Sequence, residues 1–295
     1  MNTKPAGLRD WIAATRPRTL TASVSPALLG CALAYCDGVF RPGAAVLCLL
    51  VALLGQIAAN FANDYFDFKQ GADTDARLGP ERAVAGGRIA PAAMLTATFL
   101  TLGLACVCGL GLLFYAPWWL IFVGIAIAAG VLAYSTGPFP LAWHGWGDVC
   151  VLLFYGMVPV CFTYYVQALS FDILSFWLSL SVGLLSVNIL IVNNYRDYDQ
   201  DKAVGKRTSI VYFGRKFGCR LYLLNGALAI LFSLPLLREA TLWMDALYVA
   251  FFLLFLTTWR ELIRFQGHAL NGTLGRTARN VFLYTLLLIL TLLLQ

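Results

Sequence analysis

The sequence predicts an all-α fold, a polytopic membrane bundle of about nine transmembrane helices. Of its 295 residues, 60% are hydrophobic and only 12% are charged, whereas a soluble chain carries roughly 25% charged residues. The apolar residues also occur in runs of about 18 to 23, the length with which a helix crosses a hydrocarbon core of ~30 Å. Disorder is excluded because 14% of the residues are aromatic. We therefore expect a single transmembrane domain, residues 1–295.

The helices can be placed in order from the punctuation between the apolar runs. The first run follows the basic stretch Arg16-Pro-Arg18, ends before Asp37-Gly38, and has no cleavage site after it, so we expect it to remain as the first helix. Later breaks fall at Ala116-Pro117, Gly137-Pro138 and Arg238-Glu239. The expected spans are residues 19–36, 43–62, 92–114, 117–135, 148–168, 173–193, 220–237, 241–258 and 279–294. An odd number of spans places the two termini on opposite sides of the membrane.

The basic residues indicate the orientation. All but two of the 21 lysines and arginines fall on the side of the N-terminus, and the exceptions are Arg41 and Arg238. The positive-inside rule then places the N-terminus and the charged loops in the cytoplasm, and we expect the bacterial cytoplasmic (inner) membrane. The net charge of +6 is explained by topology and by contact with anionic lipid headgroups, so no nucleic-acid partner is expected.

Two acidic segments stand at the cytoplasmic ends of the second and sixth spans. Each contains Asn followed by Asp four residues later, as Asn63 and Asp67 and as Asn193 and Asp197. Residues four apart share one face of a helix, so Asp201 is expected on the face of Asn193 and Asp197. Carboxylates stacked in this way repel one another unless a cation lies between them. Over half of the 15 acids lie in these segments: Asp64, Asp67, Asp73, Asp75, Glu81, Asp197, Asp199 and Asp201.

Oxygen ligands in two facing clusters suit Mg²⁺, which keeps several waters and is usually completed by substrate phosphates. Neighbouring basic residues could hold a diphosphate; they are Arg77, Arg82, Arg88, Arg196, Lys206 and Arg207. The alternative is that each acidic run is a solvated loop beside the membrane. Two matching runs that each adjoin an apolar helix argue against it, because acids and amides at the edge of the bilayer are costly unless they line a polar cavity.

These stretches resemble the UbiA superfamily of intramembrane aromatic prenyltransferases, and within it the 1,4-dihydroxy-2-naphthoate polyprenyltransferases (MenA type) of menaquinone biosynthesis. The resemblance covers nearly the whole chain. The superfamily motifs are Arg16-Pro-Arg-Thr19, Asn63-Asp-Tyr-Phe-Asp67 with Gly71-Ala-Asp-Thr74, and Asn193 to Asp201 with Gly205-Lys-Arg-Thr208. The naphthoate assignment depends on Tyr134-Ser-Thr-Gly-Pro138, Gly147-Asp148, Tyr164-Tyr-Val-Gln167 and the stretch Leu270-Asn271 to Thr277-Ala278.

The resemblance implies a central cavity under a cytoplasmic cap, where a polyprenyl chain passes from its diphosphate to 1,4-dihydroxy-2-naphthoate with loss of CO₂ and diphosphate. The product would be demethylmenaquinone. By position, the implied Mg²⁺ ligands are Asn63, Asp64, Asp67, Asp73, Asn193, Asp197 and Asp201, of which Asp67, Asp197 and Asp201 are the expected catalytic acids. The implied substrate-binding residues are Asn63, Asn193, Arg196, Lys206, Arg207, Arg82, Arg88 and Tyr134.

The expected site departs from the family pattern at one position and includes one set of candidate aromatic residues. Related enzymes often carry a basic residue in the loop after the fourth helix, but residues 137–146 contain no Lys or Arg. Either His144 substitutes, or the basic residues of other loops suffice. Tyr134, Tyr164 and Tyr165 are candidates to face a passing allylic cation. The base that removes a proton from the acceptor is not identified, and an acid of the second segment is one candidate.

Two other functions are compatible with part of this pattern. The same chemistry could act on another aromatic acceptor, such as 4-hydroxybenzoate, homogentisate or a porphyrin alcohol. A cation-coupled transporter would also use paired acids, but that function favours acids near the middle of the bilayer, whereas these follow the ends of apolar helices.

Overall fold

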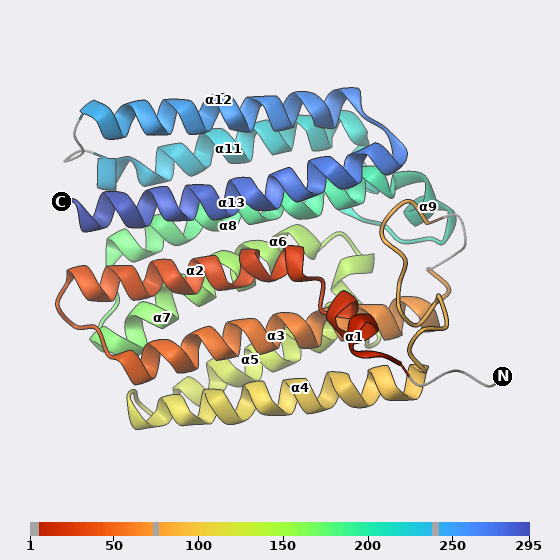
Figure 1. Ribbon diagram of the computed structural model, residues 1–295, viewed down its shortest axis with the longest axis horizontal. Helices are drawn as coiled ribbons and strands as arrows, with labels where there is room; N and C mark the ends of the chain where they lie inside the picture. Colours follow the sequence, from red (N-terminus) through yellow and green to blue (C-terminus); the bar gives the residue numbers. More distant parts are fainter. Residues whose placement is uncertain (1–5, 73–76, 238–241) are drawn as a thin grey trace.

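Long helices lie side by side along one direction in the computed structural model, which describes residues 6–72, 77–237 and 242–295 (Figure 1). Within those ranges the regular structure is entirely helical. The long helices are α2 (Pro17–Cys36), α3 (Pro42–Lys69), α4 (Pro91–Gly111), α5 (Leu120–Ala133), α6 (Gly147–Leu152) continuing into α7 (Val158–Ala168), α8 (Ile173–Arg196), α11 (Arg215–Leu237), α12 (Leu242–Arg264) and α13 (Leu270–Leu293). The short helices are α1 (Leu8–Ala14), α9 (Tyr198–Ala203) and α10 (Ser209–Phe213).

The predicted membrane bundle is confirmed. Eight of the described helical segments are long and apolar enough to cross a membrane, and α5 is a shorter apolar helix of 14 residues. Large apolar side chains such as Phe99, Leu104 and Phe122 remain exposed on its surface, as expected where lipid rather than water is the solvent. The chain is therefore an integral membrane protein.

Several helices extend beyond the predicted ends. The second and sixth spans were expected to end at residues 62 and 193, but α3 continues to Lys69 and α8 to Arg196. The last helix begins at Leu270 rather than at residue 279. Helical hydrogen bonds do not require apolar side chains, so hydropathy locates only the part of each helix that matches the bilayer. As a result, Asn63 and Asp67 lie on the last turns of α3.

The face predicted for Asn193, Asp197 and Asp201 is interrupted. Helix α8 ends at Arg196, and Asp197 joins it to the separate short helix α9, which carries Asp201. The backbone N–H of Asp201 still donates to the carbonyl oxygen of Asp197 at 2.8 Å. The two acids therefore remain close although the helix bends between them.

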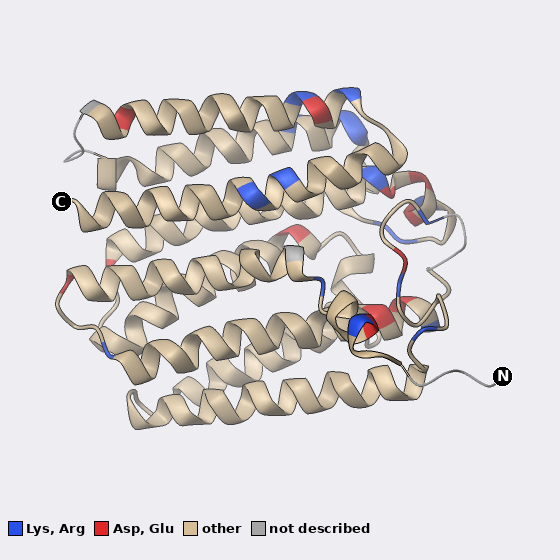
Figure 2. Cartoon of the chain, in the orientation of Figure 1, with Lys and Arg blue, Asp and Glu red and all other residues tan. Residues whose placement is uncertain are grey.

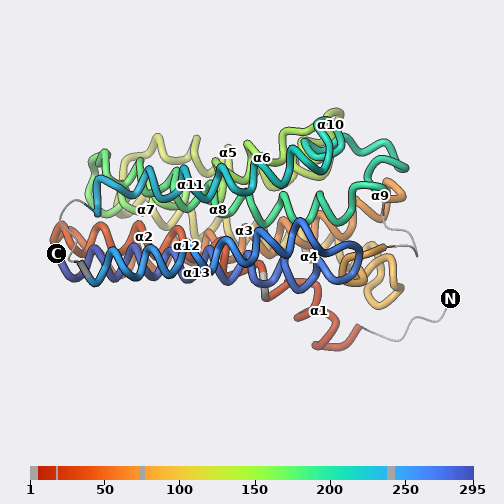
Figure 3. Tube along the Cα trace, turned by 90° about the horizontal axis from the view of Figure 1, so that it is seen from above, coloured from red at the N-terminus to blue at the C-terminus, as the bar shows by residue number. Residues whose placement is uncertain are grey.

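Most of the charged residues gather at one end of the bundle (Figure 2). This end also contains the N-terminal part of the chain, α1 and α9, while the C-terminus lies at the opposite end (Figure 1). The view from above likewise places α1, α9 and α10 at this end (Figure 3). The acids of the two segments thus lie at an end of the bundle and not at its middle, which is contrary to what a midplane cation pathway requires.

Candidate active site

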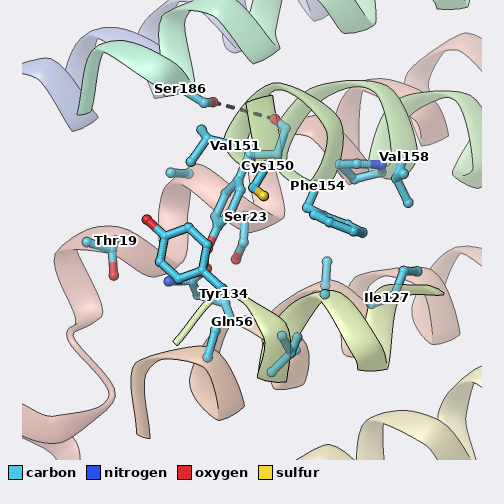
Figure 4. Close-up of a pocket in the computed structure, with 18 of the residues that line it drawn as sticks. Thr19, Ser23, Gln56, Ile127, Tyr134, Cys150, Val151, Phe154, Val158 and Ser186 are labelled. Atoms are coloured by element: carbon cyan, nitrogen blue, oxygen red, sulfur yellow. Dashed lines mark hydrogen bonds between the residues drawn. The ribbon is translucent and has the colours of Figure 1, made fainter. Parts of the chain in front are cut away.

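A cavity of about 340 Å³ lies among α2, α3, α5, α8 and the helix formed by α6 and α7. Most of its wall is apolar, with side chains such as Val123, Ile127, Phe154 and Val158. Figure 4 shows Phe154, Val158 and Ile127 on one side of the cavity and Tyr134 with Thr19 on the other. At its polar end the cavity is lined by both predicted segments, through Asn63, Asp67, Asn193 and Lys206.

The helix that carries Phe154 and Tyr155 into the cavity is irregular for an identifiable reason. Residues Leu153–Met157 form a π-helical segment between α6 and α7, and Pro159, which has no N–H to donate to the carbonyl oxygen of Tyr155, follows it. The Ser186 hydroxyl of α8 lies 3.5 Å from that oxygen and donates to it (Figure 4). A π-helical segment of this kind is frequent at functional sites, and here it lies in the cavity wall.

The first acidic segment contributes Asn63 and Asp67. The Ser135 hydroxyl donates to Oδ1 of Asn63, and Nη2 of Arg82 lies 2.9 Å from Oδ2 of Asp67 with both side chains largely buried. Arg82 also lines the cavity. The structure therefore brings Asn63, Asp67 and Arg82 together, as the sequence predicted.

Asp64 differs from its expected role as a metal ligand. Its side chain is 1% exposed, and its two carboxylate oxygens accept the backbone N–H groups of Ala83 and Val84, each at 3.1 Å. It is not among the residues that line the main cavity. Adjacent helical residues face different sides, and Asp64 faces the loop after α3, which it holds in place.

Arg196 connects the second segment to the rest of the cap. It donates from Nε and Nη2 to the two carboxylate oxygens of Asp197, each at 2.7 Å, and from Nη2 to Oδ1 of Asn193 at 2.7 Å. Its Nη1 donates to Oδ1 of Asn271 at 2.7 Å, and Nδ2 of Asn271 donates to the carbonyl oxygen of Leu78 at 2.9 Å. The guanidinium is 2% exposed, so it is a buried hub linking α8, α13 and the loop after α3.

Lys206 lies between the carboxylates of the two segments. Its Nζ is 3.4 Å from Oδ1 of Asp201. Burial by itself lowers the pKa of Lys206, but the charges of Asp201, Asp67 and Asp197 outweigh burial and raise it. The ammonium is thus surrounded by acids that come from both segments.

The carboxylate of Asp201 is buried and lies close to other acids. Burial raises its pKa to about 6; the Lys206 ammonium lowers the pKa, and the charges of Asp197 and Asp67 raise it further. Its Oδ2 is buried and makes no hydrogen bond to the described residues. A buried oxygen without a partner costs free energy, which would be relieved by a cation.

These residues fit a divalent cation by the chemistry of their donors. Within the described part of the chain, no three His, Cys, Asp or Glu side chains stand close enough together to hold a metal ion. Asp67, Asp197 and Asp201 instead each face a cationic side chain of the protein. Hard carboxylate and amide oxygens are the donors Mg²⁺ prefers, and the unpartnered Oδ2 of Asp201 gives such an ion an additional ligand.

Six of the expected site residues that the structure describes do not line this cavity: Asp64, Arg88, Arg196, Asp197, Asp201 and Arg207. Arg88 lines a second, adjacent cavity, where it lies 3.7 Å from Oε2 of Glu81 and donates to the Glu81 carbonyl oxygen. Arg207 is exposed, and its backbone N–H donates to the carbonyl oxygen of Trp143. Asp73 lies outside the described residues.

Of the three tyrosines expected to face an allylic cation, only Tyr134 lines the cavity (Figure 4). The Tyr164 hydroxyl instead donates to Oδ2 of Asp37 at 2.6 Å, far along the bundle from the acidic segments. Tyr165 packs on Trp119 and Phe171. Neither tyrosine lines the cavity. The sequence could not predict this, because the helical spacing of apolar residues does not show which face of a buried helix meets a cavity.

His144, one candidate to replace the missing basic residue of its loop, makes its contacts within that loop. Its ring stacks on Phe139 at 3.7 Å between centroids, and Nδ1 lies 2.8 Å from the carbonyl oxygen of Pro140. The cavity is lined by its neighbour Gly145 rather than by His144. The cations at the polar end come from the other loops, as Arg82 and Lys206.

Sequence reasoning assigned no role to Arg16, although it quoted the motif that contains it. Arg16 lines both cavities, and its backbone is left-handed, with φ of 52°. A residue other than glycine in this conformation is strained, and such strain clusters at functional sites. Because backbone conformation cannot be seen in the motif, only the structure identifies Arg16 as a further cavity residue.

The chain belongs to the UbiA prenyltransferase family, whose sequence profile matches residues 23–274. It is 33% identical to 1,4-dihydroxy-2-naphthoate octaprenyltransferase of Escherichia coli (strain K12), over 95% of this chain and 94% of that protein. It is 38% identical to the enzyme of the same name from Mycobacterium leprae, over 74% of each chain. The predicted resemblance is therefore confirmed.

Solved structures share the fold. A UbiA homologue from Archaeoglobus fulgidus, solved with bound DMAPP and Mg²⁺, superposes with a TM-score of 0.66 over 95% of this chain and 99% of its own, at 14% identity. A homologue from Aeropyrum pernix gives a TM-score of 0.67 over 96% of this chain and 98% of its own, at 12% identity.

Proposed function

We propose that this protein transfers a polyprenyl chain from polyprenyl diphosphate to 1,4-dihydroxy-2-naphthoate, with loss of CO₂ and diphosphate, as a step of menaquinone biosynthesis. The observation that carries this is the meeting of Asn63 and Asp67 with Asn193 and Lys206 at one end of a largely apolar cavity. A charged diphosphate and an apolar chain attached to it need these two environments side by side. The names of the E. coli and M. leprae relatives support the naphthoate acceptor.

We propose Asp67, Asp197 and Asp201 as the acids that bind Mg²⁺, with Asn63 and Asn193 as further oxygen donors. When bound, the ion supplies charge stabilisation for the departing diphosphate. Asp64 holds the loop after α3 and is left out of this ligand set, because both of its oxygens are used by backbone N–H groups. The bound A. fulgidus homologue supports a divalent cation together with a prenyl diphosphate.

The cationic side chains of the site have two sets of partners, the acids of the protein and the phosphate oxygens of the substrate. In the described structure Arg82, Arg196 and Lys206 neutralise Asp67, Asp197 and Asp201. When these acids have another cation to bind, the same three side chains are available to phosphate oxygens, to which Arg binds in a bidentate fashion. Diphosphate leaves as a strongly charged anion, and preorganised donors aimed at that charge lower the barrier to breaking the carbon–oxygen bond.

The apolar wall protects the allylic cation from water. Phe154, Ile127 and Val158 give the cavity an apolar wall, which favours exclusion of water, and the aromatic rings of Tyr134, Tyr155 and Phe154 can stabilise a passing cation. We propose that the whole chain forms one domain, which carries out the transfer. We place it in the bacterial inner membrane with the N-terminus and both acidic segments cytoplasmic, as the basic residues indicate.

Incubation of the purified protein in detergent with Mg²⁺, farnesyl diphosphate and carboxyl-labelled 1,4-dihydroxy-2-naphthoate tests the proposal. We expect a prenylated product that has lost the label, because decarboxylation releases it, and slow turnover of 4-hydroxybenzoate. Label that stays in the product, or faster turnover of 4-hydroxybenzoate, would move the protein to another branch of the family.

A further inference from the structure

Two polar side chains in the cavity wall make no hydrogen bond to the described residues. Oδ1 of Asp148 and Oγ of Ser209 are both buried without a hydrogen-bond partner in that part of the chain, and both residues line the cavity. Buried polar atoms are usually paired because an unpaired one costs about 1–3 kcal/mol. Two of them in one cavity wall need an explanation.

Asp148 and Ser209 are held close together by the surrounding backbone. The Ser209 hydroxyl lies beside the Asp148 carboxylate, although Oδ1 of Asp148 and Oγ of Ser209 form no hydrogen bond of standard geometry. The loop before Asp148 is bound to the segment before Ser209, since the backbone N–H of Arg207 donates to the carbonyl oxygen of Trp143 at 2.8 Å. Asp148 itself lies in the first turn of α6. Two structural elements thus present a carboxylate and a hydroxyl to the same space.

This pair lies next to the proposed diphosphate site but is separate from it. A Cβ atom on Gly147 would lie 3.6 Å from the Tyr134 hydroxyl, and Tyr134 is within electrostatic range of both Asp148 and Asp67. Tyr134 therefore lies near both Asp148 and Asp67 of the first acidic segment. Unlike Asp67, Asp197 and Asp201, Asp148 forms no ion pair with any described residue, so its carboxylate is not neutralised by the protein.

We infer that Asp148, assisted by the Ser209 hydroxyl, binds a phenolic hydroxyl of the aromatic acceptor and accepts its proton. The inference rests on the proposed function. A buried carboxylate without a cation and a hydroxyl beside it are complementary to a phenol: the carboxylate accepts the O–H, and Ser209 donates to the phenol oxygen. The highly charged diphosphate would be repelled there, which distinguishes this place from the anion-binding end.

The proton and electron balance of the step follows from the acceptor. The ring carbon bearing the carboxylate forms a bond to the allylic carbon, whose bond to diphosphate oxygen breaks with its electron pair. The adjacent ring hydroxyl gives its proton to Asp148 and becomes a carbonyl. The β-keto acid so formed loses CO₂, the electron pair of the broken carbon–carbon bond restores the ring, and the proton returns from Asp148 to the ring oxygen. Asp148 is unchanged overall, and the immediate product is the hydroquinone form of demethylmenaquinone, so no oxidant is needed.

Asp148→Asn tests the inference, with Asp199→Asn as the matched control. Asp199 pairs with Arg215 on the exposed surface and lines neither cavity. We expect Asp148→Asn to lower kcat with naphthoate by at least about 100-fold, a usual contribution of a positioned proton acceptor, while its affinity for farnesyl diphosphate and Mg²⁺, measured by thermal shift, stays within about twofold of wild type. Asp199→Asn should behave as wild type.

Two further measurements separate proton acceptance from a structural role. A ring-fluorinated naphthoate with a more acidic hydroxyl gives up its proton more readily, so the ratio of wild-type to Asp148→Asn rates should shrink at least about tenfold with it. Ser209→Ala should raise the KM for naphthoate and leave the KM for farnesyl diphosphate unchanged. A constant ratio, or an unchanged KM for naphthoate, would overturn the inference.

Other outcomes are equally decisive. Activity of Asp148→Asn within about threefold of wild type, well short of the effect of a lost proton acceptor, contradicts the inference. Loss of farnesyl diphosphate affinity together with activity also contradicts it, because Asp148 would then belong to the metal site. If wild type prenylates 4-hydroxybenzoate but not naphthoate, the proposed function fails at its acceptor, and the same variants then test Asp148 on that phenol.

Discussion

Nη2 of Arg82 lies 2.9 Å from Oδ2 of Asp67, and the two side chains are only 9% and 11% exposed. The pair joins the loop after α3 to the helix that carries the first acidic segment. The protein therefore supplies its own cation to an acid that we propose as a metal ligand. Binding of the metal must compete with this contact, and the following predictions depend on that exchange.

Arg82→Gln should destabilise the metal-free protein by about 3–5 kcal/mol, because it leaves a buried carboxylate without its partner. Mg²⁺ should restore part of the lost stability, since the ion neutralises the same carboxylate. We expect Mg²⁺ to raise the Tm of Arg82→Gln more than that of wild type in a detergent thermal-shift assay. Equal increases in the two proteins would show that Asp67 is not the site of exchange.

Asp67→Ala and Asp197→Ala should each lower kcat by at least about 100-fold while the protein stays folded and inserted, because each removes charge stabilisation that acts mainly in the transition state. Turnover of farnesyl diphosphate with naphthoate measures the loss, and gel filtration checks the fold. Asp199→Ala, on the exposed face of α9, is the control. Near-wild-type turnover of either variant at saturating Mg²⁺ would contradict the model of two facing acidic segments.

Asn271→Ala should weaken binding of the prenyl diphosphate without removing any proposed ligand. It deletes the contacts from Asn271 to Arg196 and to the Leu78 carbonyl oxygen, so the guanidinium loses its position. A loss of about 1.4 kcal/mol corresponds to a tenfold increase in KM, with a smaller change in kcat. An unchanged KM would mean that Asp197 and Asn193 alone position Arg196.

Gly79→Ala offers an independent test of the same hub. A Cβ atom at Gly79 would lie 2.7 Å from Nη2 of Arg196, so the loop or the guanidinium must move. We expect a higher KM for the prenyl diphosphate. Gly103→Ala on α4 is the control, because a Cβ atom there meets nothing within 4 Å. Similar KM values for the two variants would argue that the loop adjusts freely.

Single cysteines should report the orientation in the membrane. In a background without native cysteines, Gln70→Cys and Lys202→Cys, both exposed at the charged end, should react with an impermeant thiol reagent only from the cytoplasmic side. Phe40→Cys, exposed between α2 and α3, should react only from outside. The reverse pattern of labelling in intact and permeabilised cells would refute the proposed orientation.

The sequence by itself determined the membrane bundle and the position of both acidic segments. Apolar runs of bilayer length form helices in lipid, because a helix satisfies the hydrogen bonds of every backbone polar group within itself. The pairs Asn63 with Asp67 and Asn193 with Asp197 could be found because helical spacing is a local property. The same locality explains why the predicted spans stopped early: hydropathy ends where the apolar residues end, and α3 and α8 do not.

Only the tertiary structure decided which polar side chains meet. Asp64 turns to the backbone of the loop after α3, Arg207 remains exposed, and Arg88 lies in the adjacent cavity, although all three stand in or near the motifs. Asp148 and Ser209 come together from segments about 60 residues apart. The helices that line the cavity are likewise distant in the sequence and meet only through packing. Such meetings depend on how helices pack against one another, and residue spacing within one helix carries no information about its neighbour.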